Sequence, residues 1–169
     1  MKLIVKKYID QYQKAHHREL AYFMNMPSLK VAISKASLVK DNPDLFFSHQ
    51  RRISHDALAR FESSLQSYFH RNIKISDFQQ LYRSVLDCKV KGVGPLTIYD
   101  TALRIGAFLR IAPSEVYLQC GSKRGAKKLK IFTSSPSVPA SRFHPALRDL
   151  KPSEIENLLC IYEDEIQGA

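Results

Sequence analysis

The sequence predicts an all-α protein, a compact multi-helix domain over residues 1–169, and three observations support this. Apolar residues recur at helical spacing through most of the chain. Serines and prolines stand where helices are expected to begin. No convincing run of residues alternates apolar and polar side chains as a half-buried strand would. A chain of 169 residues, 44% of them apolar, is long enough to bury a sizeable core.

Residues 1–75 are expected to form the N-terminal helices. The stretch from Leu3 to Met26 carries apolar residues at roughly helical spacing, and Pro27 or Ser28 begins a new element. Four apolar residues then repeat at i, i+3, i+4 and i+7, which gives a second helix its buried face: Leu29, Ala32, Ile33 and Ala36.

A turn and a longer helix complete this region. Aspartate, asparagine and proline at 41–44 are typical turn residues. Ser54 is a suitable N-cap because its hydroxyl can accept an early helical amide. The helix that Ser54 begins runs to about His70 and buries a row of large apolar side chains: Leu58, Phe61, Leu65, Tyr68 and Phe69.

Residues 76–131 contain the feature around which the chain is organised. A capping box over 76–79 begins a helix that ends near Cys88, and a second helical pattern runs from Leu96 to Leu109. Two glycines and a proline stand between the two patterns. Glycine tolerates positive φ in a tight turn, and proline fits the first position of a helix. The stretch therefore predicts a helix, a tight hairpin turn and a second helix.

This turn is suited to an anionic oxygen. The free N–H groups of the turn and of the second helix point outward, where the helix N-terminus favours negative charge. We expect backbone amides, a helix-start contact and two cations to bind the anion: Gly92, Val93 and Gly94 as amide donors, Thr97 at the helix start, and Lys89 and Lys91 as charge partners.

The segment 78–109, with Gly92-Val93-Gly94-Pro95 at its centre, resembles the helix-hairpin-helix motif of DNA-binding proteins. It departs from that motif at Ile98, where the family commonly has a small residue that packs the two helices together. The resemblance implies that the hairpin amides hold a DNA phosphate without reading bases, and that backbone carbonyls hold a monovalent cation at the hairpin. An ordinary αα-turn that uses glycine to change direction is the alternative interpretation.

A second basic segment follows. Nine basic residues stand against two acidic ones between Lys89 and Lys130, so positive charge is concentrated around the hairpin. Gly121 would end one element, and a helix from Ser122 to Ile131 would bring its N-terminus and its cations to a second phosphate. The expected contacts are Ser122, Lys123, Arg124, Lys127 and Lys128. A solvated basic helix face is the alternative.

The remaining segments are expected to be a loop and a closing helix. Residues 112–115 predict a loop and a new helix start, and residues 132–151 a loop rich in proline, serine and threonine. Pro152 and a capping box over 153–156 begin a C-terminal helix within 152–169. Six acidic residues from Asp149 onward give this end of the chain an acidic tip.

An enzyme is the alternative that the resemblance raises, because helix-hairpin-helix proteins include DNA glycosylases of base-excision repair. In the bifunctional glycosylases a lysine lies two residues after the second hairpin glycine, where this chain has Leu96. Without that amine no Schiff base can form at the position. Glu115 is the only acid in the region where the family has an aspartate, so it is a weak candidate for a catalytic residue.

Composition favours a polyanionic partner. The formal net charge is +10, which attracts nucleic acid. Three widely spaced cysteines favour reduced thiols in a cytoplasmic protein. Adjacent His16 and His17 would point to different sides of a helix, so a solvated face is favoured over a metal site. We expect no membrane segment and no metal.

The sequence therefore predicts a DNA-binding protein without strong sequence preference that contacts backbone phosphates of duplex DNA. A glycosylase-like repair enzyme and a helical protein-interaction module, whose acidic tail docks on a basic surface, are the alternatives.

Overall fold

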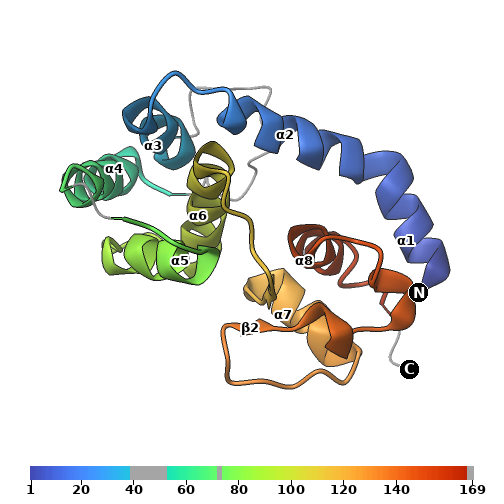
Figure 1. Cartoon of the computed structure of the whole chain (residues 1–169). Coiled ribbons are helices and arrows are strands. Elements are labelled where there is room, and N and C mark those ends of the chain that lie inside the picture. The colour runs from blue at the N-terminus through green and yellow to red at the C-terminus, as the bar shows by residue number, and fades with distance from the viewer. Residues whose placement is uncertain (39–52, 72–73, 167–169) are drawn as a thin grey trace. The chain divides into compact units, whose positions relative to one another are not determined.

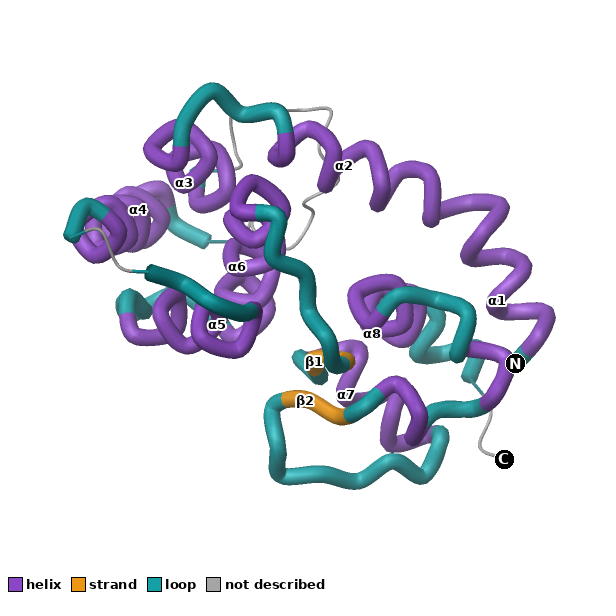
Figure 2. Tube along the Cα trace, in the orientation of Figure 1, coloured by secondary structure: helices purple, strands orange, loops and turns teal. Residues whose placement is uncertain are grey.

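The computed structural model describes residues 1–38, 53–71 and 74–166, and within them the chain is mainly α-helical with one small two-stranded sheet (Figures 1 and 2). This confirms the predicted mainly α-helical class. The chain divides into two compact units: unit 1 comprises Met1–Arg18 and Pro113–Ala169, and unit 2 comprises Glu19–Ala112. The expectation of a single domain stays a prediction. The turn predicted at 41–44 lies outside the described residues.

Unit 2 is a bundle of helices. α6 packs against both α3 and α5, and α3 also packs against α4. The core is formed by the apolar faces of these helices. Phe61, Leu65 and Leu81, for example, are fully buried. The bounds are Lys14–Met24 for α2, of which Glu19 onward belongs to this unit, Leu29–Ser37 for α3, His55–Phe69 for α4, Phe78–Asp87 for α5 and Pro95–Leu109 for α6.

Two of the predicted helix starts in unit 2 are confirmed and one is wrong by a residue. Ser28 caps α3 and Ser54 caps α4, each through its side-chain oxygen. α5 is capped by Asp77, whose Oδ1 accepts from the Gln80 amide at 2.8 Å, and not by Ser76. Aspartate and serine are equally good N-caps, so the sequence pattern alone fits either register.

A buried cation lies inside unit 2. Arg104 on α6 is 2% exposed, and its Nε donates to Glu19 Oε1 at 2.9 Å. Its Nη1 donates to the Ala36 carbonyl at 3.3 Å, and the guanidinium lies 5.9 Å from the centre of the Phe23 ring. Arg104 therefore joins α2, α3 and α6, and its charge does not contribute to a surface that a polyanion could reach.

The N-terminal part of unit 1 is helical with one irregularity. α1 covers Lys2–Tyr8, a π-helical segment covers Ile9–Gln13, and α2 follows. The prediction of a helix from Leu3 to Met26 is thus confirmed in outline, but one wide turn interrupts the α-helical bonding. Tyr8 is fully buried in the core of the unit.

The rest of unit 1 differs from the prediction in its strands. β1 (Val116–Tyr117) pairs antiparallel with β2 (Ser137–Val138), with Val116 opposite Val138. The predicted helix start at 112–115 is therefore wrong. The predicted loop over 132–151 contains β2 and two 3₁₀ turns, at Ala140–Arg142 and Pro145–Leu147.

Two helices, α7 (Cys120–Lys128) and α8 (Pro152–Ile161), pack against each other in unit 1. A Cβ atom at Gly125 would lie 2.6 Å from the Leu159 carbonyl oxygen, so only glycine permits this approach. α8 begins at Pro152, but the predicted capping box over 153–156 is wrong, because the N-cap is Lys151, two residues before Ser153. There, the Lys151 amide donates to Glu154 Oε2 at 2.7 Å.

Candidate functional site

The hairpin between α5 and α6 is the first candidate site. The chain leaves α5 at Cys88 and enters α6 at Pro95, with Gly94 as the N-cap and Pro95 at the first helical position, as predicted. The Val93 amide donates to the Val90 carbonyl at 3.2 Å, which closes the turn. The Val93 side chain is 2% exposed and anchors the hairpin in the core of unit 2.

The two hairpin glycines have different roles. Gly92 has a φ of 98°, which an L-residue rarely adopts, and a Cβ there would lie 3.2 Å from the Ala57 Cβ of α4. Gly94 has an extended backbone, with φ −93° and ψ 170°, and a Cβ would meet nothing within 4 Å. Gly92 is therefore required by the turn, whereas Gly94 faces open space that a bound molecule can occupy.

The backbone amides at this site differ in availability. The Val93 amide is already bonded within the turn, so only two of the three predicted amide donors are left, those of Gly92 and Gly94, which donate to no acceptor in the described part of the chain. The first turn of a helix adds further free amides. In α6 these belong to Leu96 and Thr97, which precede the Ile98 amide that bonds to the Gly94 carbonyl at 3.2 Å.

Two lysines supply positive charge at the hairpin. Lys89 and Lys91 are exposed, and neither forms an ion pair with another described residue. The Thr97 side chain is 3% exposed, so its predicted role at the helix start can be filled only by its amide. The hairpin thus presents free amides and two solvated cations.

The basic helix α7 in unit 1 divides into two faces. Arg124 donates to Glu163 Oε1 at 2.7 Å, and this contact raises the pKa of the guanidinium. Lys128 donates to the Glu163 carbonyl and lies 3.8 Å from Asp164. These two cations are held by the acidic C-terminal segment. Lys123 and Lys127 are exposed on the other face, beside a small pocket.

The prediction for Ser122 is wrong. α7 begins at Cys120 with Gln119 as its N-cap, so Ser122 is the third residue of the helix and is fully buried. Its Oγ accepts from the Gln119 amide and donates to the Gln119 carbonyl, both at 2.8 Å. The hydroxyl is therefore used inside the helix start, and it is not available to a phosphate.

Glu115, the weak catalytic candidate, has a structural partner. Its Oε2 accepts from the Ser137 hydroxyl at 2.6 Å, which links the residue before β1 to β2. The residue belongs to unit 1, while the hairpin belongs to unit 2.

A buried polar cluster in unit 1 was missed by the sequence analysis. Glu154 on α8 is 3% exposed and accepts from Gln13 at 2.9 Å and from His17 at 2.6 Å, in addition to the Lys151 amide. Burial alone would raise the pKa of this carboxyl, but the hydrogen bonds from Lys151, Gln13 and His17 outweigh burial and lower the pKa. We call Glu154 and its three donors the Glu154 cluster.

His16 lies beside this cluster and is 6% exposed, with its Nε2 3.4 Å from the Ser153 hydroxyl. The expectation of a solvated face is therefore wrong for His16, whereas the His17 side chain is 49% exposed although it also bonds to Glu154. The signal that could have found the cluster is Pro152, since proline at the first helical position places Glu154 where it reaches back to the N-cap amide.

The described ranges contain no group of three or more histidine, cysteine or acidic side chains that could hold a metal ion. None of the helices described combines the length and the apolar character that crossing a bilayer requires.

Comparison with known proteins gives no relative of this chain. No protein-family model matches it, and neither a curated protein nor a solved structure is significantly similar to it.

Proposed function

We propose that this protein binds duplex DNA through the hairpin between α5 and α6, by contacts to backbone phosphates and without strong sequence preference. The observation that carries the proposal is the turn itself. Free amides of Gly92 and Gly94 stand at the N-terminus of α6, where the helix dipole favours an anion. Lys89 and Lys91 add solvated positive charge at the same place.

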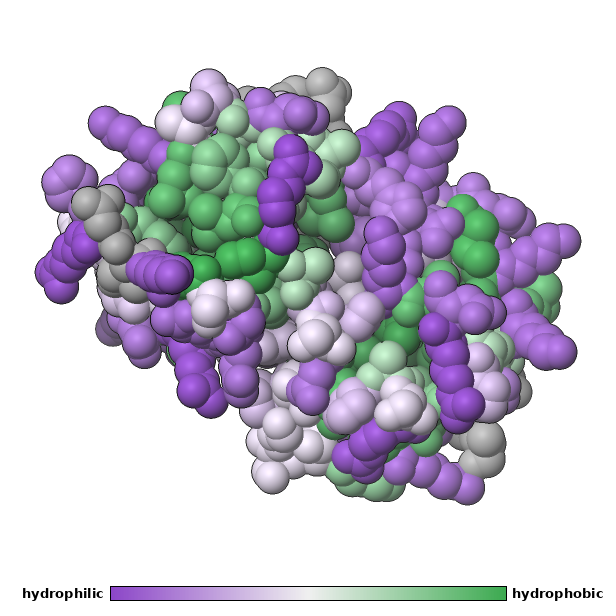
Figure 3. Space-filling view, viewed as in Figure 1, coloured by the Kyte–Doolittle hydropathy of each residue, from purple (hydrophilic) through white to green (hydrophobic). Residues whose placement is uncertain are grey.

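Charge supports a phosphate rather than a neutral ligand. The chain carries a formal net charge of +10, which attracts a polyanion before any specific contact forms. In Figure 3, hydrophilic side chains project from the visible face of each unit. No observation favours the glycosylase alternative, because Glu115 is bonded to Ser137 and Leu96 stands where the bifunctional family has its lysine.

A titration of labelled duplex DNA by fluorescence anisotropy at several salt concentrations tests the proposal. Gly94→Val adds a side chain into open space and should weaken binding on the order of 1–3 kcal/mol, because it separates the amides from the phosphate. Its backbone conformation suits a β-branched residue, so the thermal unfolding temperature should change little.

Lys91→Ala should weaken binding less and should reduce the slope of log K against log salt by about 0.9, the value for one phosphate contact. Lys35→Ala removes an exposed charge from α3 in the same unit and serves as the matched control, with the slope expected to stay near that of the parent. If folded Gly94→Val binds duplex DNA like the parent, the hairpin is only a turn and the proposal fails.

A further inference from the structure

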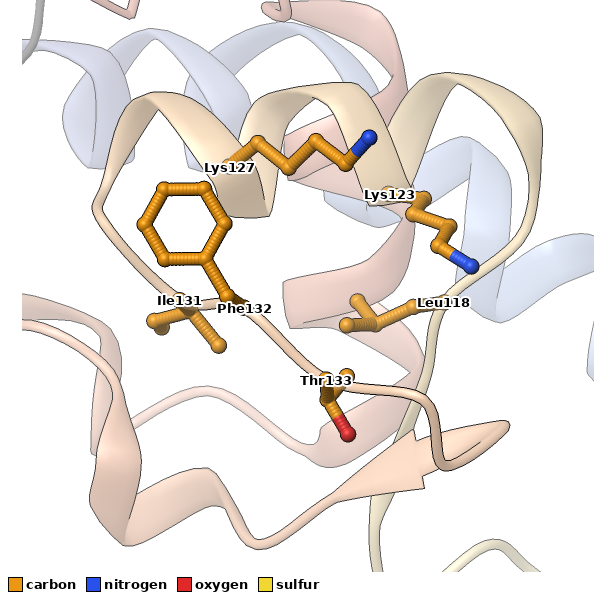
Figure 4. A pocket seen from close by; sticks show the side chains of 6 residues that line it. All are labelled: Leu118, Lys123, Lys127, Ile131, Phe132 and Thr133. Atoms are coloured by element: carbon orange, nitrogen blue, oxygen red, sulfur yellow. The ribbon is translucent and has the colours of Figure 1, made fainter.

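A small pocket lies beside α7 in unit 1, whereas the hairpin belongs to unit 2. Its volume is about 230 Å³. α7 supplies two lysines along one side, and the opposite side is formed by apolar and hydroxyl-bearing side chains from the segments around β1 and after α7 (Figure 4). The lining residues are Leu118, Lys123, Lys127, Ile131, Phe132 and Thr133.

The lysines of the pocket are the uncommitted cations of α7. Lys123 and Lys127 are four residues apart, which places them on one face of the helix. They form no ion pair within the ranges that the structure describes, whereas Arg124 and Lys128 meet the acidic segment at Glu163 and Asp164. The two α7 cations without an ion pair to another described residue therefore both line the pocket.

Phe132 is the second unusual feature. Its side chain is 67% exposed, although the neighbouring Ile131 is buried in the core of unit 1. An exposed aromatic ring beside two cations offers a flat apolar surface for stacking and positive charge for an anion at the same place. This combination is what bases and phosphates of a single strand require.

We propose that this pocket binds single-stranded nucleic acid, with a base stacked on Phe132 and the flanking phosphates held by Lys123 and Lys127. The inference takes nucleic acid as the ligand from the proposed function but places it at a separate site in unit 1. A duplex does not fit this site, because its bases are stacked inside the helix and cannot reach Phe132. The pocket is smaller than a typical small-molecule site of about 300–1,000 Å³, which suits one base rather than a larger ligand.

Phe132→Trp gives a direct reporter of stacking. The chain contains no tryptophan, so the variant carries a single indole at the pocket. Titration with an oligothymidine single strand should quench its fluorescence with the same dissociation constant that anisotropy measures. Phe132→Ala should weaken binding of that strand by about 5- to 150-fold, the scale of one lost base stack. Phe132 is exposed, so both variants should unfold at the parent temperature.

The lysines are tested with a matched pair. Lys123→Ala/Lys127→Ala should reduce the log–log salt slope for the single strand by about 1.4, from about 0.7 for each phosphate. Lys2→Ala/Lys6→Ala removes two exposed lysines with the same spacing from α1 of the same unit, and should leave the slope near the parent value. Equal effects of the two double variants would overturn the assignment of these lysines.

Further measurements distinguish a single-strand site in unit 1 from other interpretations of the same data. Gly94→Val should leave quenching of Phe132→Trp by oligothymidine unchanged, and Phe132→Ala should leave duplex binding unchanged. If Gly94→Val loses duplex binding but leaves this quenching unchanged, the result supports the proposed function and shows that the single-strand site is independent of the hairpin. Thymidine monophosphate that quenches Phe132→Trp as tightly as the oligonucleotide would show a free-nucleotide site and overturn the single-strand assignment. Parent-like binding of oligothymidine by Phe132→Ala would overturn it as well.

Discussion

Replacing Glu154 by glutamine tests how much the Glu154 cluster stabilises unit 1. The carboxylate accepts three hydrogen bonds, from the Lys151 amide at 2.7 Å, Gln13 at 2.9 Å and His17 at 2.6 Å. A glutamine has one acceptor oxygen, so its NH₂ group must face at least one of these donors. Losing one bond to a charged acceptor costs about 1.5–3 kcal/mol, and the remaining bonds weaken because the acceptor is neutral. We expect Glu154→Gln to lower the free energy of unfolding by about 2–4 kcal/mol.

The lowered pKa of Glu154 determines the pH range in which this carboxylate stabilises the folded state. The folded-state pKa of Glu154 lies below its ordinary value of 4.5, so its contribution is fully present above that value and is lost as the pH falls through the folded-state pKa. Urea unfolding of parent and variant should therefore differ most at pH 7 and converge in acid. Glu165→Gln, which breaks an exposed pair with Lys7, is the control and should change stability little, because exposed ion pairs are screened by solvent. A parent–variant difference that is unchanged between pH 7 and pH 3 would refute this reasoning.

Two other predictions concern unit 2. Arg104→Met should lower the free energy of unfolding by about 3–5 kcal/mol, because it removes the charged partner of Glu19 from the interior, and adding Glu19→Leu should restore part of the loss. Urea denaturation measures both, and a double variant no more stable than the single one would contradict the pairing. Gly92→Ala should cost about 1–2 kcal/mol, because its φ of 98° disfavours a Cβ, whereas Gly94→Ala should unfold at the parent temperature in a thermal melt.

Local rules predicted most of the helices of this chain. Ser54 was recognised as a cap, and the start of α3 was placed at Pro27 or Ser28, of which Ser28 is the cap. The predicted N-caps Ser76 and Ser153 were wrong, because a second capping arrangement fits the same stretch of sequence in each case. At the C-terminal helix the decisive signal was Pro152, whose fixed φ suits the first helical position and moves the N-cap to Lys151.

Features that depend on contacts distant in sequence were not predictable. β1 and β2 are two residues each and are separated by about twenty residues, so neither shows the alternation that identifies a strand. The ion pair of Arg104 joins residues 85 positions apart. The π-helical segment at Ile9–Gln13 has no recognised sequence signature and lies within a pattern that fits a continuous helix.

The basic segment shows why counting charges along the chain misplaces a binding surface. In sequence, Lys123, Arg124, Lys127 and Lys128 form one cluster, and the acidic end is a separate feature. In the structure the cluster divides into two pairs with i, i+4 spacing, and contacts with the acidic segment distinguish Arg124 and Lys128 from Lys123 and Lys127. One pair meets the acidic segment, which neutralises it, and the other pair stands at the pocket of Phe132. The positive charge that unit 1 offers to a polyanion at this helix is therefore half of what the sequence suggests, but it lies beside an exposed aromatic ring.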